Sequence, residues 1–222
     1  MRRTIILIAG CIFIIYAPAM AEDNWSKALA QAAADGKSIR SITPVFSQLV
    51  MFSFQHGFKP AFQNTNSGHY IQEAVLNGET LDRWSQMITL TGAKGLAANA
   101  NINPESFLGG IAAGFKRACP DTFSVKAIGN LKIGAYDAFA AVAGCGTVQT
   151  GGYKHSEAAV LVSIKGASDY YTLQWAERGP PQAQPADLND AKWQDRLKKL
   201  GPIKICPRVP GEAPPYVSCA GS

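Results

Sequence analysis

The sequence predicts an α+β fold: an antiparallel β-sheet flanked by helices, in a single domain that ends in a disulfide-stapled, proline-rich tail. The first observation is a series of strand-like segments without regular βα alternation, which disfavours a doubly wound parallel sheet. The second is a pair of β-rich runs that flank residues 166–169, GASD, a pattern typical of a hairpin. We therefore expect this hairpin to organise the sheet.

The two strands of this hairpin differ in polarity. Residues 158–164 are apolar at nearly every position, as expected of a central strand covered on both faces. In residues 170–178 an apolar series alternates with a more polar one at period two. The apolar series is Tyr171, Leu173 and Trp175, and we expect it to face the core.

The N-terminus has the pattern of a secretory signal peptide. Arg2 and Arg3 precede an apolar run over residues 5–16, and Ala19-Met20-Ala21 supplies the small residues of a cleavage site. We predict a signal peptide over residues 1–21, an α+β domain over 22–200 and a stapled tail over 201–222. With this leader cleaved, we expect a periplasmic protein.

Two other interpretations of the leader stay open. An uncleaved anchor would use the same residues, although the apolar run is short for a membrane span. Residues 8–11, Ile-Ala-Gly-Cys, also resemble a lipoprotein signal with Cys11 as the lipid-bearing residue. Cleavage before Cys11 would leave residues 12–16 exposed, so we favour cleavage after Ala21.

The charge balance argues against nucleic-acid binding. The whole chain carries a net charge of +5, and loss of the leader leaves 19 basic and 16 acidic residues, or +3. Nucleic-acid-binding proteins usually cluster their basic residues on one face. Here the densest group, Arg196, Lys198 and Lys199, lies at a predicted helix end, where the helix dipole accounts for it. No segment after the leader is apolar enough to cross a membrane.

Four cysteines remain after the leader, and an even number in an exported protein predicts two disulfides. They are Cys119, Cys145, Cys206 and Cys219. Of three possible pairings we favour Cys119 with Cys145 and Cys206 with Cys219. The second pair would close a short loop within the proline-rich tail, and closure of about 15 residues contributes roughly 3 kcal/mol.

The first half of the chain predicts a helix and then strands. Residues 24–35 have an N-cap, apolar residues on one face and a terminal glycine, as in a packing helix. Residues 46–54 and 69–76 have strand patterns and are expected to pair as a hairpin, with residues 63–68 as a loop. The segment 79–91 predicts a turn and then a strand.

The second half predicts a loop, two helices and more strands. Residues 92–103 are small and polar and are the best candidate for a mobile loop. Residues 104–118 have apolar side chains at helical spacing after Asn103, and residues 188–200 repeat this pattern. Further strands are expected at residues 123–128, 133–138 and 139–148.

Two segments carry a resemblance to known proteins. They are GHYIQEAVLNGETLDRWSQMITLTG, which begins at Gly68, and YYTLQWAERG, which begins at Tyr170. Both resemble a group of uncharacterised exported proteobacterial proteins, and they are faintly similar to the Mog1/PsbP-like fold. The resemblance covers residues 45–178 and implies an antiparallel sheet sandwiched by helices. It implies no activity and no site residues.

No recognisable catalytic or metal-binding motif appears. His56, His69 and His155 all lie next to turns without the spacing of metal ligands, so we expect surface or loop histidines and no metal site. A catalytic cysteine is disfavoured because exported, evenly paired cysteines are usually oxidised. The carboxylates Glu73, Glu79, Asp82 and Glu157 would have to converge through the fold to act as an acid–base pair. No pattern indicates a cofactor.

Aromatic residues supply the remaining signal for binding. We expect Trp84, Tyr171 and Trp175 to lie in the core because their neighbours are apolar at strand spacing. Tyr170, on the more polar face, and Arg178, at the strand end, are the better surface candidates. Together with Tyr70 they form our predicted binding residues.

The sequence therefore favours a non-enzymatic periplasmic domain that binds another envelope or exported protein, as an adaptor, envelope-assembly factor or inhibitor. Two alternatives remain. One is an envelope hydrolase with a site assembled from distant residues. The other is a carrier of a small ligand or lipid between the helix at residues 104–118 and the sheet.

Overall fold

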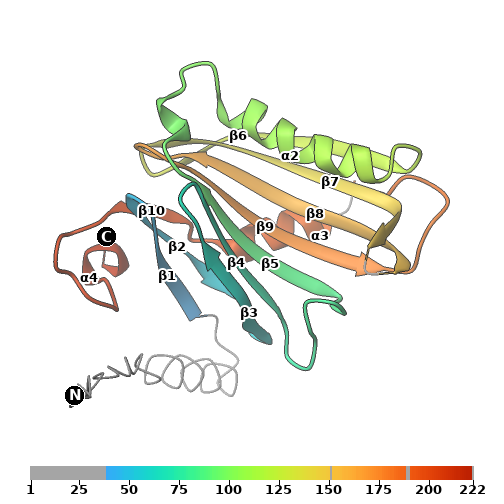
Figure 1. Ribbon diagram of the computed structural model, residues 1–222, viewed down its shortest axis with the longest axis horizontal. Helices are drawn as coiled ribbons and strands as arrows, with labels where there is room; N and C mark the ends of the chain where they lie inside the picture. The colour runs from blue at the N-terminus through green and yellow to red at the C-terminus, as the bar shows by residue number, and fades with distance from the viewer. Residues whose placement is uncertain (1–38, 151, 189–190, 222) are drawn as a thin grey trace, which may run out of the picture.

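Figure 1 shows the computed structural model of the protein, which describes residues 39–150, 152–188 and 191–221. Its elements form two antiparallel sheets, of seven strands in the order β3-β4-β5-β9-β8-β7-β6 and of three strands in the order β1-β2-β10. The strands are β1 (Ile39–Val45), β2 (Gln48–Phe54), β3 (Phe58–Thr65), β4 (His69–Leu76), β5 (Gln86–Ala93), β6 (Phe123–Ile133), β7 (Tyr136–Thr150), β8 (Tyr153–Lys165), β9 (Tyr170–Gly179) and β10 (Lys204–Pro207). The helices are η1 (Leu96–Ala98), α2 (Pro104–Ala118), α3 (Ala191–Leu200) and α4 (Val217–Ala220). The predicted α+β class is confirmed, with β-sheet as the larger part.

The seven-stranded sheet is covered differently on its two faces. Helix α2 packs on β6, β7 and β8, and it buries Leu108 and Ala112 there. On the opposite face, residues of β1, β2, β10 and α3 share one apolar core with the large sheet. Because each strand alternates its side chains between the two faces, β8 and β9 supply both cores.

The predicted central hairpin is confirmed. Strands β8 and β9 pair from Ser156 opposite Gly179 to Lys165 opposite Tyr170, and the Gly166 amide donates to the Asp169 carbonyl oxygen at 2.9 Å. The expected core residues of β9 are buried, since Tyr171, Leu173 and Trp175 are at most 2% exposed. Strand β9 is the fourth of seven, so it lies at the centre of the sheet.

Helix α2 begins and ends where its sequence predicts. The Asn103 side chain accepts from the Ser106 amide at 2.8 Å, and the Ser106 hydroxyl accepts from the Asn103 amide at 3.0 Å, which completes a capping box. Pro104 takes the first helical position, where a missing amide hydrogen costs nothing. At the other end, Cys119 is bonded to Cys145, which fastens the helix to β7.

Both favoured disulfide pairings are confirmed, because Cys206 is likewise bonded to Cys219. The second disulfide joins β10 to α4, and both cysteines pack against Leu49 and Met51 of β2. The tail is therefore joined to the domain by a strand and a small apolar cluster as well as by the disulfide.

Two predictions about strands are wrong, and one strand is shorter than predicted. The expected strand at residues 46–54 is β2, but it begins only at Gln48, because a turn at Phe46, whose φ is +52°, separates it from β1. Residues 63–65, expected in a loop, belong to edge strand β3, whose exposed side chains lack an apolar alternation. Residues 133–138 contain the turn from β6 to β7, where Gly134 has a φ of +60°.

The expected hairpin between residues 46–54 and 69–76 is also wrong. Strand β4 pairs with β3 and β5 in the large sheet, while β2 pairs with β1 and β10 in the small one. The predicted signal peptide, Cys11 and the helix at residues 24–35 lie outside the described residues. Among the residues described, no helix has the length and apolar character needed to cross a membrane.

Candidate functional site

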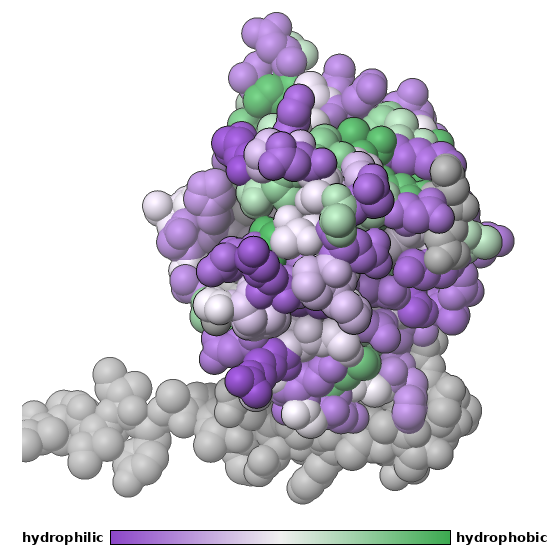
Figure 2. Space-filling view, turned by 90° about the vertical axis from the view of Figure 1, so that its right-hand side faces the viewer, coloured by the Kyte–Doolittle hydropathy of each residue, from purple (hydrophilic) through white to green (hydrophobic). Residues whose placement is uncertain are grey.

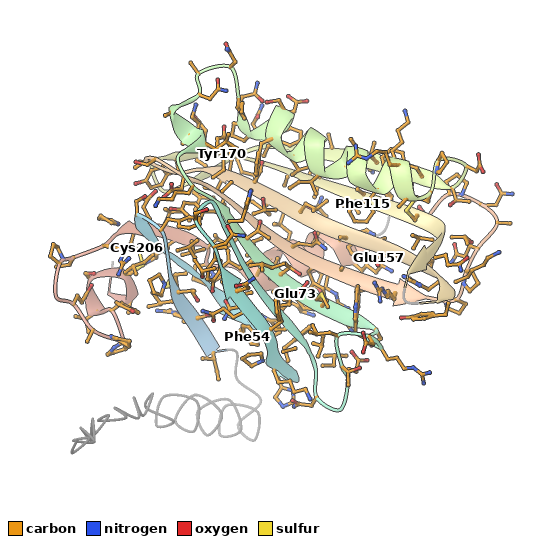
Figure 3. The ribbon with its side chains drawn as sticks, in the orientation of Figure 1. Phe54, Glu73, Phe115, Glu157, Tyr170 and Cys206 are labelled. Carbon is orange, nitrogen blue, oxygen red and sulfur yellow. A yellow bond between two sulfur atoms is a disulfide. The ribbon has the colours of Figure 1, made fainter. Side chains whose placement is uncertain are left out.

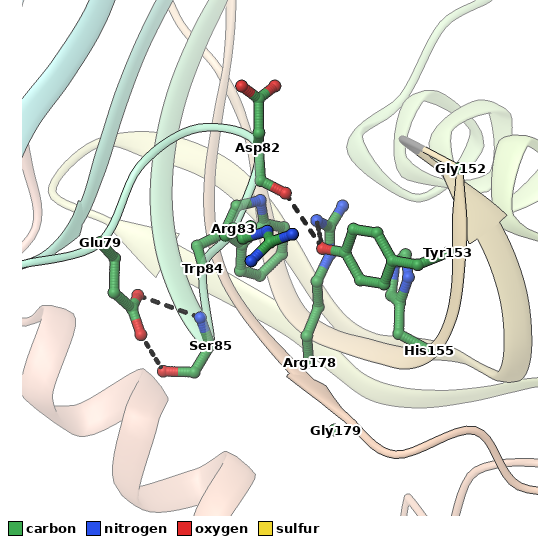
Figure 4. A pocket seen from close by; sticks show the side chains of 10 residues that line it. All are labelled: Glu79, Asp82, Arg83, Trp84, Ser85, Gly152, Tyr153, His155, Arg178 and Gly179. Carbon is green, nitrogen blue, oxygen red and sulfur yellow. Dashed lines mark hydrogen bonds between the residues drawn. The ribbon is translucent and has the colours of Figure 1, made fainter.

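A pocket of about 780 Å³ lies where the end of β9, the start of β8 and the β4–β5 loop converge. Figure 2 faces this end of the molecule, whose surface is mostly hydrophilic with small hydrophobic areas between. Figure 4 shows the residues that line the pocket. They are Glu79, Asp82, Arg83, Trp84, Ser85, Gly152, Tyr153, His155, Arg178 and Gly179.

Arg178 is held from three directions. Its guanidinium lies over the Trp84 ring, with 3.7 Å between Cζ and the ring centroid, so a cation–π contact fixes one face. Its Nε donates to Glu157 Oε2 at 2.8 Å, and its Nη1 donates to the Tyr153 hydroxyl at 3.2 Å. The side chain is 13% exposed, so these contacts are only partly screened by water.

The loop at residues 77–85 places Trp84 beneath this guanidinium. The Glu79 carboxylate accepts from the Ser85 amide at 3.0 Å and from the Ser85 hydroxyl at 2.5 Å, which closes the loop. The Arg178 amide donates to the Ser85 carbonyl at 2.8 Å, and the Tyr153 hydroxyl donates to the Asp82 carbonyl at 3.1 Å. Hydrogen bonds from β8 and β9 therefore anchor the loop on both sides.

His155 forms part of the pocket wall. The residue is 3% exposed, its ring centroid lies 4.9 Å from that of Tyr153, and its Nε2 is 3.4 Å from Glu157 Oε2. Neither ring nitrogen has a hydrogen-bond partner within the described chain. The expectation that His155 lies on the surface is wrong, because β8 turns this side chain toward the sheet face and under Tyr153.

A second pocket of about 370 Å³ continues from the first and shares Trp84 and Arg178 with it. It lies on the sheet face that carries α2, over strands that the helix does not cover. Its other lining residues are Glu73, Leu81, Met87, Thr89, Glu157 and Gln174. Burial raises the pKa of the Glu73 carboxyl, which Figure 3 labels together with Glu157.

The structure separates the three predicted binding residues. Arg178 lines both pockets, whereas Tyr170 lies at the opposite end of β9. Tyr170 is fully buried: its hydroxyl donates to the Ile102 carbonyl at 2.7 Å, and its ring packs on Phe107 at 4.6 Å between centroids. The expectation that Tyr170 lies on the surface is wrong, because the segment leading into α2 covers this polar face of the strand.

Tyr70 is also buried, at 4% exposed, in the core between the two sheets. Burial raises the pKa of its phenol well above the ordinary value, and its hydroxyl has no hydrogen-bond partner among the residues described. Neither tyrosine reaches the pocket around Arg178. The carboxylates singled out in the sequence divide between the two pockets: Glu79 and Asp82 line the first, and Glu73 and Glu157 line the second.

The sequence could have revealed part of this site. With Lys165 opposite Tyr170 across the turn, counting back along the hairpin pairs Glu157 with Arg178. Trp84 is different, because it reaches Arg178 only through the long-range pairing of β5 with β9. In the described part of the chain, no three His, Cys, Asp or Glu side chains gather as metal ligands would.

No family model matches this sequence, and no curated protein matches it. Among solved structures, it is similar to the Ran-binding protein Mog1p of Saccharomyces cerevisiae, at 10% identity over 74% of this chain and 86% of that one, with a TM-score of 0.40. It is also similar to LpqN, described as involved in cell envelope biogenesis of Mycobacterium tuberculosis, at 11% identity over 80% and 96%, with a TM-score of 0.37. Both similarities are faint and concern the fold alone, as does the resemblance to the Mog1/PsbP-like fold noted in the sequence.

Proposed function

We propose that the mature chain is a non-enzymatic, exported domain that binds another protein of the cell envelope through the pocket around Arg178. It would serve as an adaptor, an envelope-assembly factor or an inhibitor. Two disulfides are compatible with an oxidising compartment outside the cytoplasm. The predicted leader, which would direct export, supports the same location.

The observation that carries this proposal is the grouping of Trp84, Tyr153 and Arg178 at one pocket. Tryptophan, tyrosine and arginine are the residue types most enriched at the energetic centres of protein interfaces. The guanidinium is already ordered by Trp84 and Glu157, so a partner would restrict little additional side-chain freedom. A pre-ordered arginine on an aromatic ring suits recognition of a protein surface.

The test is a crosslinked pull-down of the tagged mature chain from its own cell envelope, with Arg178→Gln compared with the matched control Arg196→Gln. Arg196 also lies over a tryptophan, at 4.5 Å from the Trp175 ring, and also donates Nε to a glutamate, Glu177, at 2.8 Å. It belongs to α3, which packs on the opposite face of the sheet.

We expect wild type and Arg196→Gln to recover one saturable protein partner, and Arg178→Gln to recover roughly tenfold less, because a charged hydrogen-bonding anchor is lost. Circular dichroism would check that both variants fold. Equal recovery by Arg178→Gln and wild type would contradict the proposed binding site. The absence of any saturable partner for wild type would contradict the proposed function.

The proximity of His155 to Glu157 favours a second candidate, an envelope hydrolase, because a histidine and a neighbouring carboxylate, each lining one of two adjoining pockets, can act as an acid–base pair. The arrangement is incomplete in two respects. Glu157 is engaged more closely by Arg178, at 2.8 Å, and the Ser85 hydroxyl donates to Glu79. Turnover of an envelope substrate that is lost in His155→Ala would favour the hydrolase over the binding domain.

The carrier hypothesis receives less support. Leu108 and Ala112 of α2 pack directly against the sheet, within the interface where a ligand would have to lie. Native mass spectrometry of the gently purified chain would test this, because a carrier would retain a bound small molecule. A mass that matches the chain alone would argue against it.

A further inference from the structure

The guanidinium of Arg178 keeps hydrogen-bonding capacity after its structural contacts are made. Its Nε donates to Glu157, one N–H group of Nη1 donates to the Tyr153 hydroxyl, and the Trp84 ring covers one face of the guanidinium plane. Nη2 makes no hydrogen bond to any residue that the structure describes. Since Arg178 lines both pockets, this unused part of the guanidinium is available to a group that enters them.

The charged residues around the pocket indicate what charge a bound ligand group would carry. Two arginines, Arg83 and Arg178, line it together with two acidic residues, Glu79 and Asp82. The Glu79 carboxylate is engaged by Ser85, and Figure 4 shows the Asp82 carboxylate directed away from Tyr153 and Arg178. The formal charges of these four residues cancel, and Glu157, which lines the adjoining pocket, pairs with Arg178. With no excess of positive charge, the pocket suits a single negative charge better than a dianion such as a phosphate monoester.

The shape of the donor points to the same group. A guanidinium presents its N–H groups in a planar fork, which matches the two oxygens of a carboxylate. His155, nearly fully buried in the pocket wall, adds an imidazole whose nitrogens make no hydrogen bond to the described residues, with Nε2 3.4 Å from Glu157 Oε2. A buried polar group without a partner is destabilising, and a bound oxygen or a water molecule would relieve this.

We infer that the pocket is a receptor for one carboxylate of the protein partner, a C-terminus or an acidic side chain, which binds the free part of the Arg178 guanidinium. This inference rests on the proposed function and specifies the chemistry of the partner. Glu157, Tyr153 and Trp84 position the guanidinium, and His155 supports Tyr153 from below by ring contact.

The test uses the isolated mature chain and a small dicarboxylate, glutarate, with its uncharged analogue glutaramide as the control. Binding is followed by ¹⁵N-resolved NMR of the arginine Nε–H groups and of the backbone amides around Gly152 and Gly179. We expect saturable shifts with glutarate in wild type and Arg196→Gln, and affinity weaker by roughly tenfold or more in Arg178→Gln. Glutaramide should leave these signals unchanged.

Several outcomes would overturn the carboxylate assignment. Equal shifts with glutarate and glutaramide would show that charge is not recognised. Unchanged glutarate affinity in Arg178→Gln would place any anion elsewhere. Butyrate, which carries one negative charge, and inorganic phosphate are titrated in parallel. Phosphate is expected to bind more weakly than butyrate, and tighter binding of phosphate would overturn the preference for a single charge.

The two proposals can fail separately. An Arg178-dependent protein partner, combined with no glutarate binding, would overturn the carboxylate receptor and leave the protein-binding function standing. Arg178-dependent glutarate binding, combined with no protein partner, would support the receptor chemistry and overturn the protein-binding function. The pocket would then serve a small carboxylate ligand.

Discussion

At the scale of single residues, Asp169 joins three segments that are distant in sequence. Its Oδ2 accepts from the Ser47 amide at 3.1 Å and the Ser47 hydroxyl at 2.5 Å, and its Oδ1 accepts from the Gly95 amide at 2.7 Å. The Tyr171 hydroxyl adds a contact to Oδ2 at 3.4 Å. Burial on its own raises the pKa of this carboxyl, but these hydrogen bonds outweigh it, and the net pKa is below its ordinary value.

Replacement of Asp169 by Asn should lower the free energy of unfolding by roughly 2–3 kcal/mol at neutral pH. The Asn side chain has an NH2 group in place of one accepting oxygen, and this group cannot accept the hydrogen bonds from Ser47 or Gly95. A carboxyl whose pKa is lowered in the folded state stabilises it above the unfolded pKa, and this contribution is lost as pH falls through the folded pKa. Urea unfolding should therefore show the two proteins converging below about pH 4.

The control for this substitution is Asp137→Asn. Asp137 pairs with Lys132 at the surface, where its side chain is 65% exposed, so the change in stability should be small. A difference between wild type and Asp169→Asn that stays constant from about pH 7 to about pH 2 would contradict the role assigned to the Asp169 charge.

At the scale of secondary-structure elements, the C-terminal segment is more closely integrated than its composition indicates. Strand β10 pairs with β2 over four residues, from Lys204 opposite Met51 to Pro207 opposite Gln48. Residues of β10 then contribute to two cores, with Ile205 in the large one and Cys206 in the small one. The disulfide to Cys219 holds α4 against this strand.

Replacement of Cys206 and Cys219 by Ser should lower the free energy of unfolding by about 3 kcal/mol, since the disulfide closes a loop with a sequence separation of 13 residues. Hydrogen exchange should speed up in β10 and α4 and stay slow in β8 and β9, whose amides pair within the sheet.

The matched control is the double change of Cys119 and Cys145 to Ser. That disulfide spans 26 residues, so the loss should be slightly larger, and exchange should speed up at the C-terminal end of α2 instead. Loss of protection throughout the chain after the Cys206 and Cys219 changes would contradict the view that β10 and α4 open locally.

At the scale of the whole molecule, one large core connects nearly every layer. It contains side chains from the two sheets, from α3 and from β10, including Phe52, Leu173, Trp193 and Ile205. A smaller core lies under α2 on the other face of the same strands. Because β7, β8 and β9 contribute side chains to both cores, disruption of one core should destabilise the other.

We therefore expect cooperative unfolding as a single unit. Urea transitions followed by far-ultraviolet circular dichroism and by tryptophan fluorescence should coincide, since Trp84 belongs to the smaller core, on the α2 face of the sheet, while Trp175 and Trp193 lie in the larger one. Two separated midpoints would show that the layers unfold independently. Refolding from urea under the same conditions should retrace the curve, with both disulfides kept oxidised.

The elements that the sequence predicts well are those whose local pattern reports burial. Strand β9 alternates because its two faces meet different surroundings, and α2 carries both its cap and its apolar stripe in consecutive residues. Strand β3 lacks such a pattern because it is an exposed edge strand. The assignment of β2 and β4 to separate sheets depends on long-range pairing, which neither strand encodes locally.

The candidate site divides in the same way. Arg178 stands out in the sequence as a charged residue at the end of a strand, and hairpin register alone brings Glu157 opposite to it. Trp84 reaches the site through the pairing of β5 with β9, and Tyr170 becomes buried because α2 and the segment before it cover the polar face of β9. Polarity predicts exposure only where nothing else packs on that face.

By itself, the sequence determined the fold class, the central hairpin, helix α2 and the favoured disulfide pairings, because turn residues, caps, periodicity and cysteine spacing act over short stretches of chain. Only the tertiary structure decided the division into two sheets, the burial of Tyr70 and Tyr170, and the assembly of the Arg178 pocket. These features depend on which distant segments pack together. That choice is made by the burial of whole faces, and no local pattern records it.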